Sequence, residues 1–502
     1  MPGTGYFLGW LFMLLFNMTG VPEHNGTMAA TPALISTDTL KTPVIPVDTI
    51  NLDQYPFLSP SANVLINDSS LTSFFTKLEL LEHEQIPRLN IVHIGDSHVQ
   101  ADWWTGFLRQ RLQGQFGSAG RGLVFPFQLA DTNSPTDIRS SSNQSWEHRR
   151  STFGNTHIPL GISGMTIQTR GSQVWLDLEI RNDTLIDYSF DQVGLFGQSG
   201  PDFLNWQIGT FARTDQIKMA PPPKRYHTVR SGDTLYGLAL KYGTRVNSIQ
   251  RWNNMHGTMI RPGQRLVVGS GGQSIQTYDQ QQFEVWDSVI WESSLIRSQR
   301  ADLQMLQPGK RLLLRASKRN GGSGLARCYG ISLENTHSHG ILYHAIGVNG
   351  VTYYHYNIAE EFWGQLPYLT PDLVIVSLGT NEAAISNFRP QEFTVEVRRF
   401  LDKIRASLGA VPVLLTTPAD ALKSRRYDNP AILKIKDILL ETAAEKDMAV
   451  WDLNGAMGGP GAIKQWRAHQ LAARDYLHFT KNGYSLQGEL LFRALMRAYE
   501  QR

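Results

Sequence analysis

Five short apolar runs, placed toward both ends of this 502-residue chain, constrain its fold more than any other feature. They read LNIVHIG (89–95), GILYHAIG (340–347), DLVIVSLG (372–379), VPVLLTTP (411–418) and MAVWDLN (448–454). Each run is short and apolar on both faces, which is typical of strands inside a parallel sheet. Helical periodicity precedes or separates them at 71–84, 394–408 and 431–446. The pattern predicts an α/β fold with about five parallel strands and helices on both faces.

The middle of the chain has a different character. From residue 166 to 340, apolar and polar residues alternate, and glycine and aromatic residues are frequent. This pattern predicts an all-β, sandwich-like insert that divides the α/β core into two parts, 63–165 and 341–502. Inside the insert, MAPPPK (219–224) and GSGGQS (269–274) are typical of flexible connections. We therefore expect a separate small domain at 225–269, with the β insert made of 166–224 and 270–340.

The N-terminal stretch YFLGWLFMLLF (6–16) has the length of a signal-peptide core and is short for a membrane span. We interpret residues 1–20 as a signal peptide, with an uncleaved membrane anchor as the alternative, and residues 21–62 as a linker. The protein is then expected to be exported to the periplasm or cell envelope. Any membrane contact would be made through this anchor alone.

Charge and cysteine content exclude some classes of partner. Lys and Arg number 47 against 44 Asp and Glu, and this net charge of +3 argues neither for a nucleic-acid partner nor for an acidic one. We expect no nucleic-acid partner. Cys328 is the one cysteine, so no intrachain disulfide can form, and its apolar surroundings predict a buried position. Histidines at 337, 339, 344 and 355 lack nearby carboxylates, so we expect no metal site. No cofactor is implied.

The segment 226–268 contains the motifs VRSGDTLYGLALKYG, IQRWNN and IRPGQRLVV in this order. The segment resembles a LysM domain over its whole length. The resemblance implies a βααβ fold that binds peptidoglycan or another N-acetylglucosamine-containing glycan in a groove between two loops. The residues implied for this groove are Gly232, Asp233, Thr234 and Leu235 in the first loop and Ile260, Arg261 and Pro262 in the last. A purely structural insert is the alternative.

Polar residues follow three of the predicted strands. Gly95-Asp96-Ser97 comes directly after the first strand, Gly350 closes GVNG (347–350), and Asn381 lies in GTNEA (379–383). Carboxyl ends of parallel strands meet at one edge of a sheet, where ligands bind. Near the C-terminus, Asp475 and His478 are three residues apart, which suits a carboxylate that orients an imidazole base.

Each motif alone has a structural explanation as a turn, a helix cap or a surface pair. In the order GDS, GxNG, GTNE and DxxH, they resemble the SGNH, or GDSL-type, hydrolase superfamily and its cell-wall O-acetylesterase branch. The resemblance implies a three-layer, flavodoxin-like core. It assigns Ser97 as the nucleophile, His478 as the base, Asp475 as its partner, and Ser97, Gly350 and Asn381 as the oxyanion hole. Gly164, in GISG (161–164), is an alternative to Gly350.

The sequence departs from the common family pattern at two positions. His98 stands where the usual form has Leu, and Glu382 stands where many members have Asp. We expect a serine carboxylic-ester hydrolase that removes O-acetyl groups from peptidoglycan or a related amino-sugar polymer, held on the wall by its LysM module. The alternatives are an O-acetyltransferase that uses the same residues and a catalytically silent wall-binding scaffold.

Overall fold

The structure is a computed structural model. It describes residues 49–154, 157–181, 186–211, 217–219, 224–242, 244, 246–255, 257–270, 276–278 and 282–502. The expected signal peptide or anchor at 1–20 lies outside these residues. The same is true of residues 21–48 of the expected linker.

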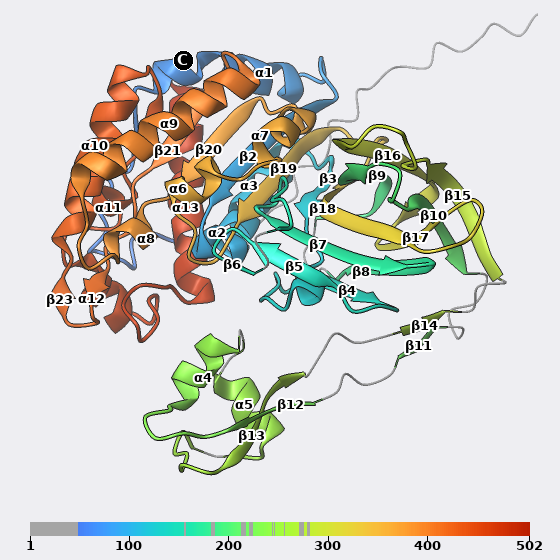
Figure 1. Ribbon diagram of the computed structural model, residues 1–502. Helices are drawn as coiled ribbons and strands as arrows, with labels where there is room; N and C mark the ends of the chain where they lie inside the picture. Colours follow the sequence, from blue (N-terminus) through green and yellow to red (C-terminus); the bar gives the residue numbers. More distant parts are fainter. Residues whose placement is uncertain are drawn as a thin grey trace, which may run out of the picture. The chain divides into compact units, whose positions relative to one another are not determined.

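A six-stranded sheet forms the centre of the α/β part (Figure 1). Its strands, in spatial order, are β1 (Leu65–Ile66), β24 (Ala449–Trp451), β21 (Val413–Thr416), β20 (Leu373–Ser377), β2 (Arg88–Gly95) and β19 (Gly340–Gly347). The five predicted strands pair in parallel, and β1 adds an antiparallel edge. The predicted α/β class is confirmed. β1 escaped prediction because two residues carry no periodicity.

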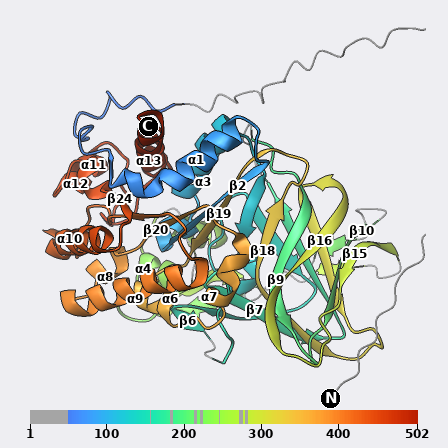
Figure 2. The same cartoon turned by 90° about the horizontal axis from the view of Figure 1, so that it is seen from above.

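Alternate strand residues face two separate helical layers, as expected for a period of two. On one face, Ile91 and Ile375 pack in a hydrophobic cluster with side chains of α1 (Thr72–Glu82), α3 (Trp104–Phe116) and α13 (Lys481–Glu500). On the other face, Val92 and Val376 pack with α6 (Tyr353–Asn357), α7 (Phe362–Gln365), α9 (Pro390–Leu408) and α10 (Pro430–Glu445). Figure 2 shows the sheet between these layers.

Shorter helices connect the strands. They are α2 (Ser97–Gln100), α8 (Thr380–Ala383), α11 (Leu453–Ala456), α12 (Ala462–Ala468), and the 3-10 helices η1 (Asp68–Leu71), η2 (Phe127–Ala130) and η5 (Leu366–Leu369). A small hairpin joins β22 (Leu422–Lys423) to β23 (Tyr427–Asp428). Two of the short helices, α2 and α8, begin right after parallel strands, so their first residues lie at the carboxyl edge of the sheet.

Two antiparallel sheets make up the all-β part. The first contains β15 (Phe283–Val289), β10 (Asn205–Phe211), β17 (Arg311–Ser317), β8 (Gln173–Ile180) and β4 (Ile138–Ser142). The second contains β16 (Arg297–Gly309), β9 (Phe190–Ser199), β18 (Gly324–Glu334), β7 (Met165–Gly171), β5 (Glu147–Arg150), β6 (Phe153–Gly154) and β3 (Gly120–Val124). β11 (Ile217–Met219) pairs with β14 (Gln276–Tyr278).

The all-β part begins earlier than the sequence suggested. We expected it from residue 166, but β3, β4 and β5 already pair with β18, β8 and β7. The partners of β3 and β4 lie far along the chain, whereas β5 pairs with the nearby β7, and the residues of 120–154 alone do not predict these pairings. The segment 120–154 is therefore part of the β sheets, although its sequence position predicted the α/β core. Cys328, on β18, is buried as expected.

The segment 224–270 has the order β12 (Lys224–Thr228), α4 (Leu235–Lys241), α5 (Val246–Trp252) and β13 (Arg265–Ser270). β12 and β13 pair antiparallel, and Lys224 lies opposite Ser270. Seven buried residues, among them Leu238, Ile249 and Val268, form a hydrophobic cluster of its own. The βααβ order agrees with the expectation for this segment.

Residues 49–62 do not behave as a linker. Ser59 donates its backbone N–H to the carbonyl of Ala456 at 3.0 Å, and the Phe57 ring lies 4.8 Å from the ring of His469. Leu58 is buried in the α/β part. The expected linker therefore ends before these residues, because scattered hydrophobic side chains find partners more than 390 residues along the chain. Within the described ranges, no helix is both long and apolar enough to cross a bilayer.

Candidate active site

Three parallel strands of the central sheet end at the same level. Gly347 at the end of β19 lies opposite Gly95 at the end of β2, and Gly95 lies opposite Ser377 at the end of β20. The loops that follow carry Ser97, Gly350 and Asn381. The hydrogen-bond register of the sheet therefore brings three motifs, far apart in sequence, to one edge.

Glycine is required at two of these strand ends because α2 passes close to them. A Cβ atom on Gly347 would lie 2.2 Å from the backbone nitrogen of Gln100. On Gly95 it would lie 2.3 Å from a methyl group of Val99 and 2.9 Å from the carbonyl of Ser377. Close approach of α2 to the strands turns the chain sharply, and this turn places Ser97 at the sheet edge.

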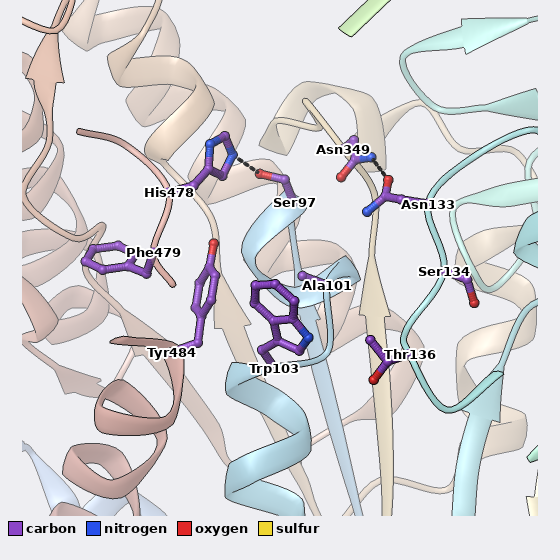
Figure 3. Close-up of a pocket in the computed structure, with 10 residues that line it drawn as sticks. All are labelled: Ser97, Ala101, Trp103, Asn133, Ser134, Thr136, Asn349, His478, Phe479 and Tyr484. Carbon is purple, nitrogen blue, oxygen red and sulfur yellow. Dashed lines mark hydrogen bonds between the residues drawn. The ribbon is translucent and has the colours of Figure 1, made fainter. Parts of the chain in front are cut away.

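Ser97, His478 and Asp475 form a chain of hydrogen bonds, and Figure 3 shows the bond between Ser97 and His478. Ser97 Oγ lies 3.2 Å from His478 Nε2, and His478 Nδ1 lies 2.9 Å from Asp475 Oδ2. The carboxylate can only accept, so Nδ1 carries the proton and Nε2 can accept from the serine hydroxyl. Backbone N–H groups of Leu477 and His478 donate to Asp475 Oδ1 and hold the carboxylate in place.

The electrostatics of this chain favour a charged Asp475. Burial raises its pKa, but the hydrogen bond and charge of His478 and two backbone N–H donors bring it down to about 2. For His478, burial lowers the pKa, whereas the hydrogen bond and charge of Asp475 outweigh that effect and leave it above the ordinary value. The imidazole is thus tuned toward a stronger base beside a permanent carboxylate.

Backbone N–H groups close to Ser97 are free to stabilise negative charge. Within the described part of the chain, the N–H groups of Ser97 and Gly350 have no protein acceptor. Gly350 lies between Asn349, which lines the pocket beside Ser97, and Val351, whose carbonyl accepts from Asn381 Nδ2 at 2.9 Å. The alternative residue, Gly164, donates its N–H to the Gly161 carbonyl at 2.9 Å. This geometry favours Gly350.

Two carboxyl groups are buried behind the serine. Burial raises the pKa of Asp96 and of Glu382 to about 7 each. Asp96 accepts from the His98 N–H at 3.0 Å and from Asn381 Nδ2 at 3.3 Å, and Glu382 accepts from the Tyr353 N–H at 2.8 Å. These bonds connect the three loops at the sheet edge. Glu382, noted as a departure from the family pattern, is thus an internal brace of the site.

A cavity of about 190 Å³ opens in front of Ser97 and His478. Besides these two residues, it is lined by Ala101, Trp103, Asn133, Ser134, Thr136, Asn349, Phe479 and Tyr484. Asp475, Gly350 and Asn381 are not among the lining residues. No sequence motif pointed to most of these lining residues. Asn349 lies inside the GVNG motif and could have been found there, whereas Asn133 to Thr136 carry no motif and reach the site through the pairing of β4.

His98, the second departure from the family pattern, does not face the cavity. It is buried, and its Nδ1 lies 2.8 Å from the Tyr484 hydroxyl. Burial and the neighbouring charge of His478 lower the pKa of His98 to about 3, so its ring is neutral. The His98 ring lies beside the His478 ring, with the ring centroids 5.3 Å apart.

In the segment 224–270, the two loops expected to form a groove meet at Val229. Its N–H donates to the Gln264 carbonyl, and its carbonyl accepts from the Gly263 N–H, each at 2.8 Å. Several of the expected groove residues have internal roles. Asp233 accepts from His227 Nε2, Thr234 caps α4 by accepting from the Gly237 N–H, and Leu235 is buried. Gly232, Arg261 and Pro262 are exposed, and Ile260 is half-buried.

Comparison with known proteins identifies two families. Residues 227–269 match the LysM domain, and residues 317–486 match the GDSL-like Lipase/Acylhydrolase family. The second match contains Gly350, Asn381, Asp475 and His478 but begins after Ser97, because the β insert separates the GDS motif from the other motifs. The chain therefore carries a GDSL-like domain and a LysM domain, and the resemblance predicted from its sequence is confirmed.

A solved structure of a peptidoglycan O-acetylesterase is similar over 89% of this chain and 99% of its own, with 20% identity and a TM-score of 0.55. This likeness shows a shared fold. Membrane-bound lytic murein transglycosylase D of Escherichia coli (strain K12) is 30% identical over 112 residues, which are 20% of this chain and 25% of the relative. Autolysin of Enterococcus faecalis is 40% identical over 52 residues, 10% of this chain and 7% of the relative.

We predict that Glu382→Gln stabilises the protein at alkaline pH. The pKa of Glu382 rises from an ordinary 4.5 to about 7 on folding, so the folded state binds more protons and loses stability as pH rises between these values. The amide cannot ionise. The free energy of unfolding of Glu382→Gln, relative to that of wild type, should therefore increase by up to about 3 kcal/mol between pH 4 and pH 8, as measured by urea unfolding.

Glu284→Gln, at an exposed position, is the matched control for the loss of one carboxylate. A difference between Glu382→Gln and wild type that stays constant over this pH range would contradict a buried, neutral Glu382.

Proposed function

We propose that this chain, with its GDSL-like domain and its LysM domain, is an exported serine esterase that removes O-acetyl groups from peptidoglycan or a related amino-sugar polymer. The observation that carries the proposal is the Ser97–His478–Asp475 chain at the mouth of a cavity, with distances of 3.2 and 2.9 Å. A hydroxyl becomes a useful nucleophile only beside an oriented base, and this is the arrangement found.

In the proposed reaction, Ser97 Oγ attacks the acetyl carbonyl while His478 Nε2 takes its proton. Asp475 holds the imidazole in the correct tautomer and stabilises the imidazolium that forms. The N–H groups of Ser97 and Gly350 stabilise the oxyanion, and Asn381 Nδ2 joins them by exchanging its 3.3 Å hydrogen bond to Asp96 for one to the oxyanion. His478 returns the proton to the leaving sugar hydroxyl, and water then attacks the acetyl-enzyme by the same path.

The substrate class rests on two similarities. The solved structure that shares the fold is a peptidoglycan O-acetylesterase, and one partial relative is by name a murein transglycosylase. The match covers only a quarter of that transglycosylase, so it does not assign transglycosylase activity to this chain. A LysM module suits a polymer substrate because weak binding of a tethered module raises the local concentration of ester groups. Cell-envelope location follows from this substrate.

We expect Ser97→Ala to lower acetate release from O-acetylated peptidoglycan by on the order of 10⁴-fold, since the nucleophile is lost. Asn381→Ala should lower it by about 10²–10³-fold through loss of one oxyanion donor. Chemically de-esterified peptidoglycan is the blank. A folded Ser97→Ala protein with wild-type activity would refute the proposal.

The same assay distinguishes an esterase from a transferase. If more acetyl groups were transferred to an added chito-oligosaccharide than were released as acetate, the protein would be a transferase.

The pH profile should follow His478, which acts only when neutral. Its pKa is raised by Asp475, so the rate of ester hydrolysis should increase with pH through a midpoint above 6.5. Asp475→Asn removes that effect and should move the midpoint to lower pH while reducing kcat by about 10²–10⁴-fold. Because Asp96 and Glu382 have pKa values of about 7, an unmoved midpoint would assign the titration to one of them instead.

The LysM module should contribute binding and not chemistry. Lys224 and Ser270 lie opposite each other on paired strands, so a short Gly-Ser linker can replace 224–270 with little strain. We expect this variant to sediment less with insoluble peptidoglycan and to hydrolyse p-nitrophenyl acetate at a rate close to wild type. Unchanged sedimentation would show that another surface holds the wall.

A further inference from the structure

Two asparagine side chains from different parts of the fold are joined on the wall of the cavity that faces Ser97. Asn349 follows β19 in the α/β part, and Asn133 lies in the loop that leads into β4 of the all-β part. Asn349 Nδ2 donates to Asn133 Oδ1 at 2.5 Å. We propose that this pair is a subsite for the acetamido group of the sugar that carries the ester, an inference that rests on the proposed esterase function.

The orientation of both amides follows from one backbone group. The Asn349 N–H can only donate, and it bonds to Gln100 Oε1 at 2.7 Å. Gln100 Nε2 therefore faces the loop and donates to the Asn133 carbonyl at 2.9 Å and to Asn133 Oδ1 at 3.2 Å. Asn133 Oδ1 is thereby turned toward Gln100 and Asn349. Asn133 Nδ2 and Asn349 Oδ1 must then point the other way.

The pair thus offers one donor and one acceptor to a ligand. Figure 3 shows the Asn133 nitrogen and the Asn349 oxygen on the side of the cavity that holds Ser97. In the described part of the chain, neither atom has a protein partner. A secondary amide has a carbonyl for the Asn133 donor and an N–H for the Asn349 acceptor. A carboxylate would match the donor but would be repelled by the Asn349 oxygen.

Both halves of the subsite are held in place before a ligand arrives. Thr152 Oγ1 donates to the Asn349 carbonyl at 3.0 Å. The loop of Asn133 is anchored by Asp137, which accepts from Arg121 Nε at 2.6 Å. Arg121 also pairs with Asp102, which lies five residues after Ser97 in the chain. Such preorganisation lowers the cost of ordering side chains on binding and makes the recognition selective.

Trp103 completes the subsite from the floor of the cavity. Its indole lines the same space as Ser97 and Asn133 and packs against Tyr484, with ring centroids 6.0 Å apart. An aromatic surface beside a hydrogen-bonding pair suits a sugar ring, which has an apolar face and polar edges. A simple acetyl ester would leave both asparagine groups unpaired, and a site built to hydrogen-bond a group discriminates against ligands that lack it.

The experiment compares two esters that differ only in this group. Methyl glycosides of 6-O-acetyl-N-acetylglucosamine and 6-O-acetylglucose are hydrolysed by wild type and by Asn133→Asp, which keeps Oδ1 but replaces the free donor with an acceptor. We expect wild-type kcat/KM to favour the acetamido sugar by about 10–100-fold, mainly through KM, and Asn133→Asp to reduce this preference by about 10-fold or more.

Asn387→Asp is the matched control, because it makes the same charge change at an exposed loop position. It should keep the full wild-type preference. Asn133→Ala repeats the test should the aspartate disturb the loop. Equal hydrolysis of both sugars by wild type, or a preference that survives both Asn133 variants, would overturn the subsite and leave the esterase standing. No hydrolysis of either ester would overturn the proposed function and the subsite with it.

Discussion

The hydrogen-bond register of three parallel strands is the constraint on which the site depends. Gly347, Gly95 and Ser377 are aligned across β19, β2 and β20, so the loops after them begin at one level. A shift of one strand by a residue would turn its apolar side chains to the wrong helical layer, because successive residues face opposite sides. Ile91 and Val92 belong to two different hydrophobic clusters. The packing of these clusters fixes the strand register, and the register keeps Gly350 and Asn381 close to Ser97.

Buried ion pairs connect the all-β part to this edge. Asp102 pairs with Arg109 and Arg121, and Arg121 pairs in turn with Asp137 in the loop before β4. All four side chains are largely shielded from water, and their charges balance. Buried charges are costly unless each is paired, so this network favours the arrangement of the two parts in which all four charges are paired. That arrangement places Asn133 opposite Ser97, which makes the β insert part of the cavity.

Three carboxyl groups at the site lie in different electrostatic environments. Asp475, bonded to His478 and two backbone N–H groups, is ionised, with a pKa of about 2. Asp96 and Glu382, buried behind the serine, have pKa values of about 7. Environments that separate pKa values in this way allow one carboxylate to support a base while the others serve as internal hydrogen-bonding groups.

The sequence alone determined the parallel strands, the LysM segment and the positions of the motifs from Ser97 to His478. Apolar strand runs and short motifs can be recognised because they consist of neighbouring residues. It did not determine where the β insert begins, since β3 and β4 find partners far along the chain. It also did not reveal the packing of residues 49–62 or the cavity wall of Asn133 to Thr136. Only the tertiary structure decided these features, because they depend on contacts between distant segments that no local pattern encodes.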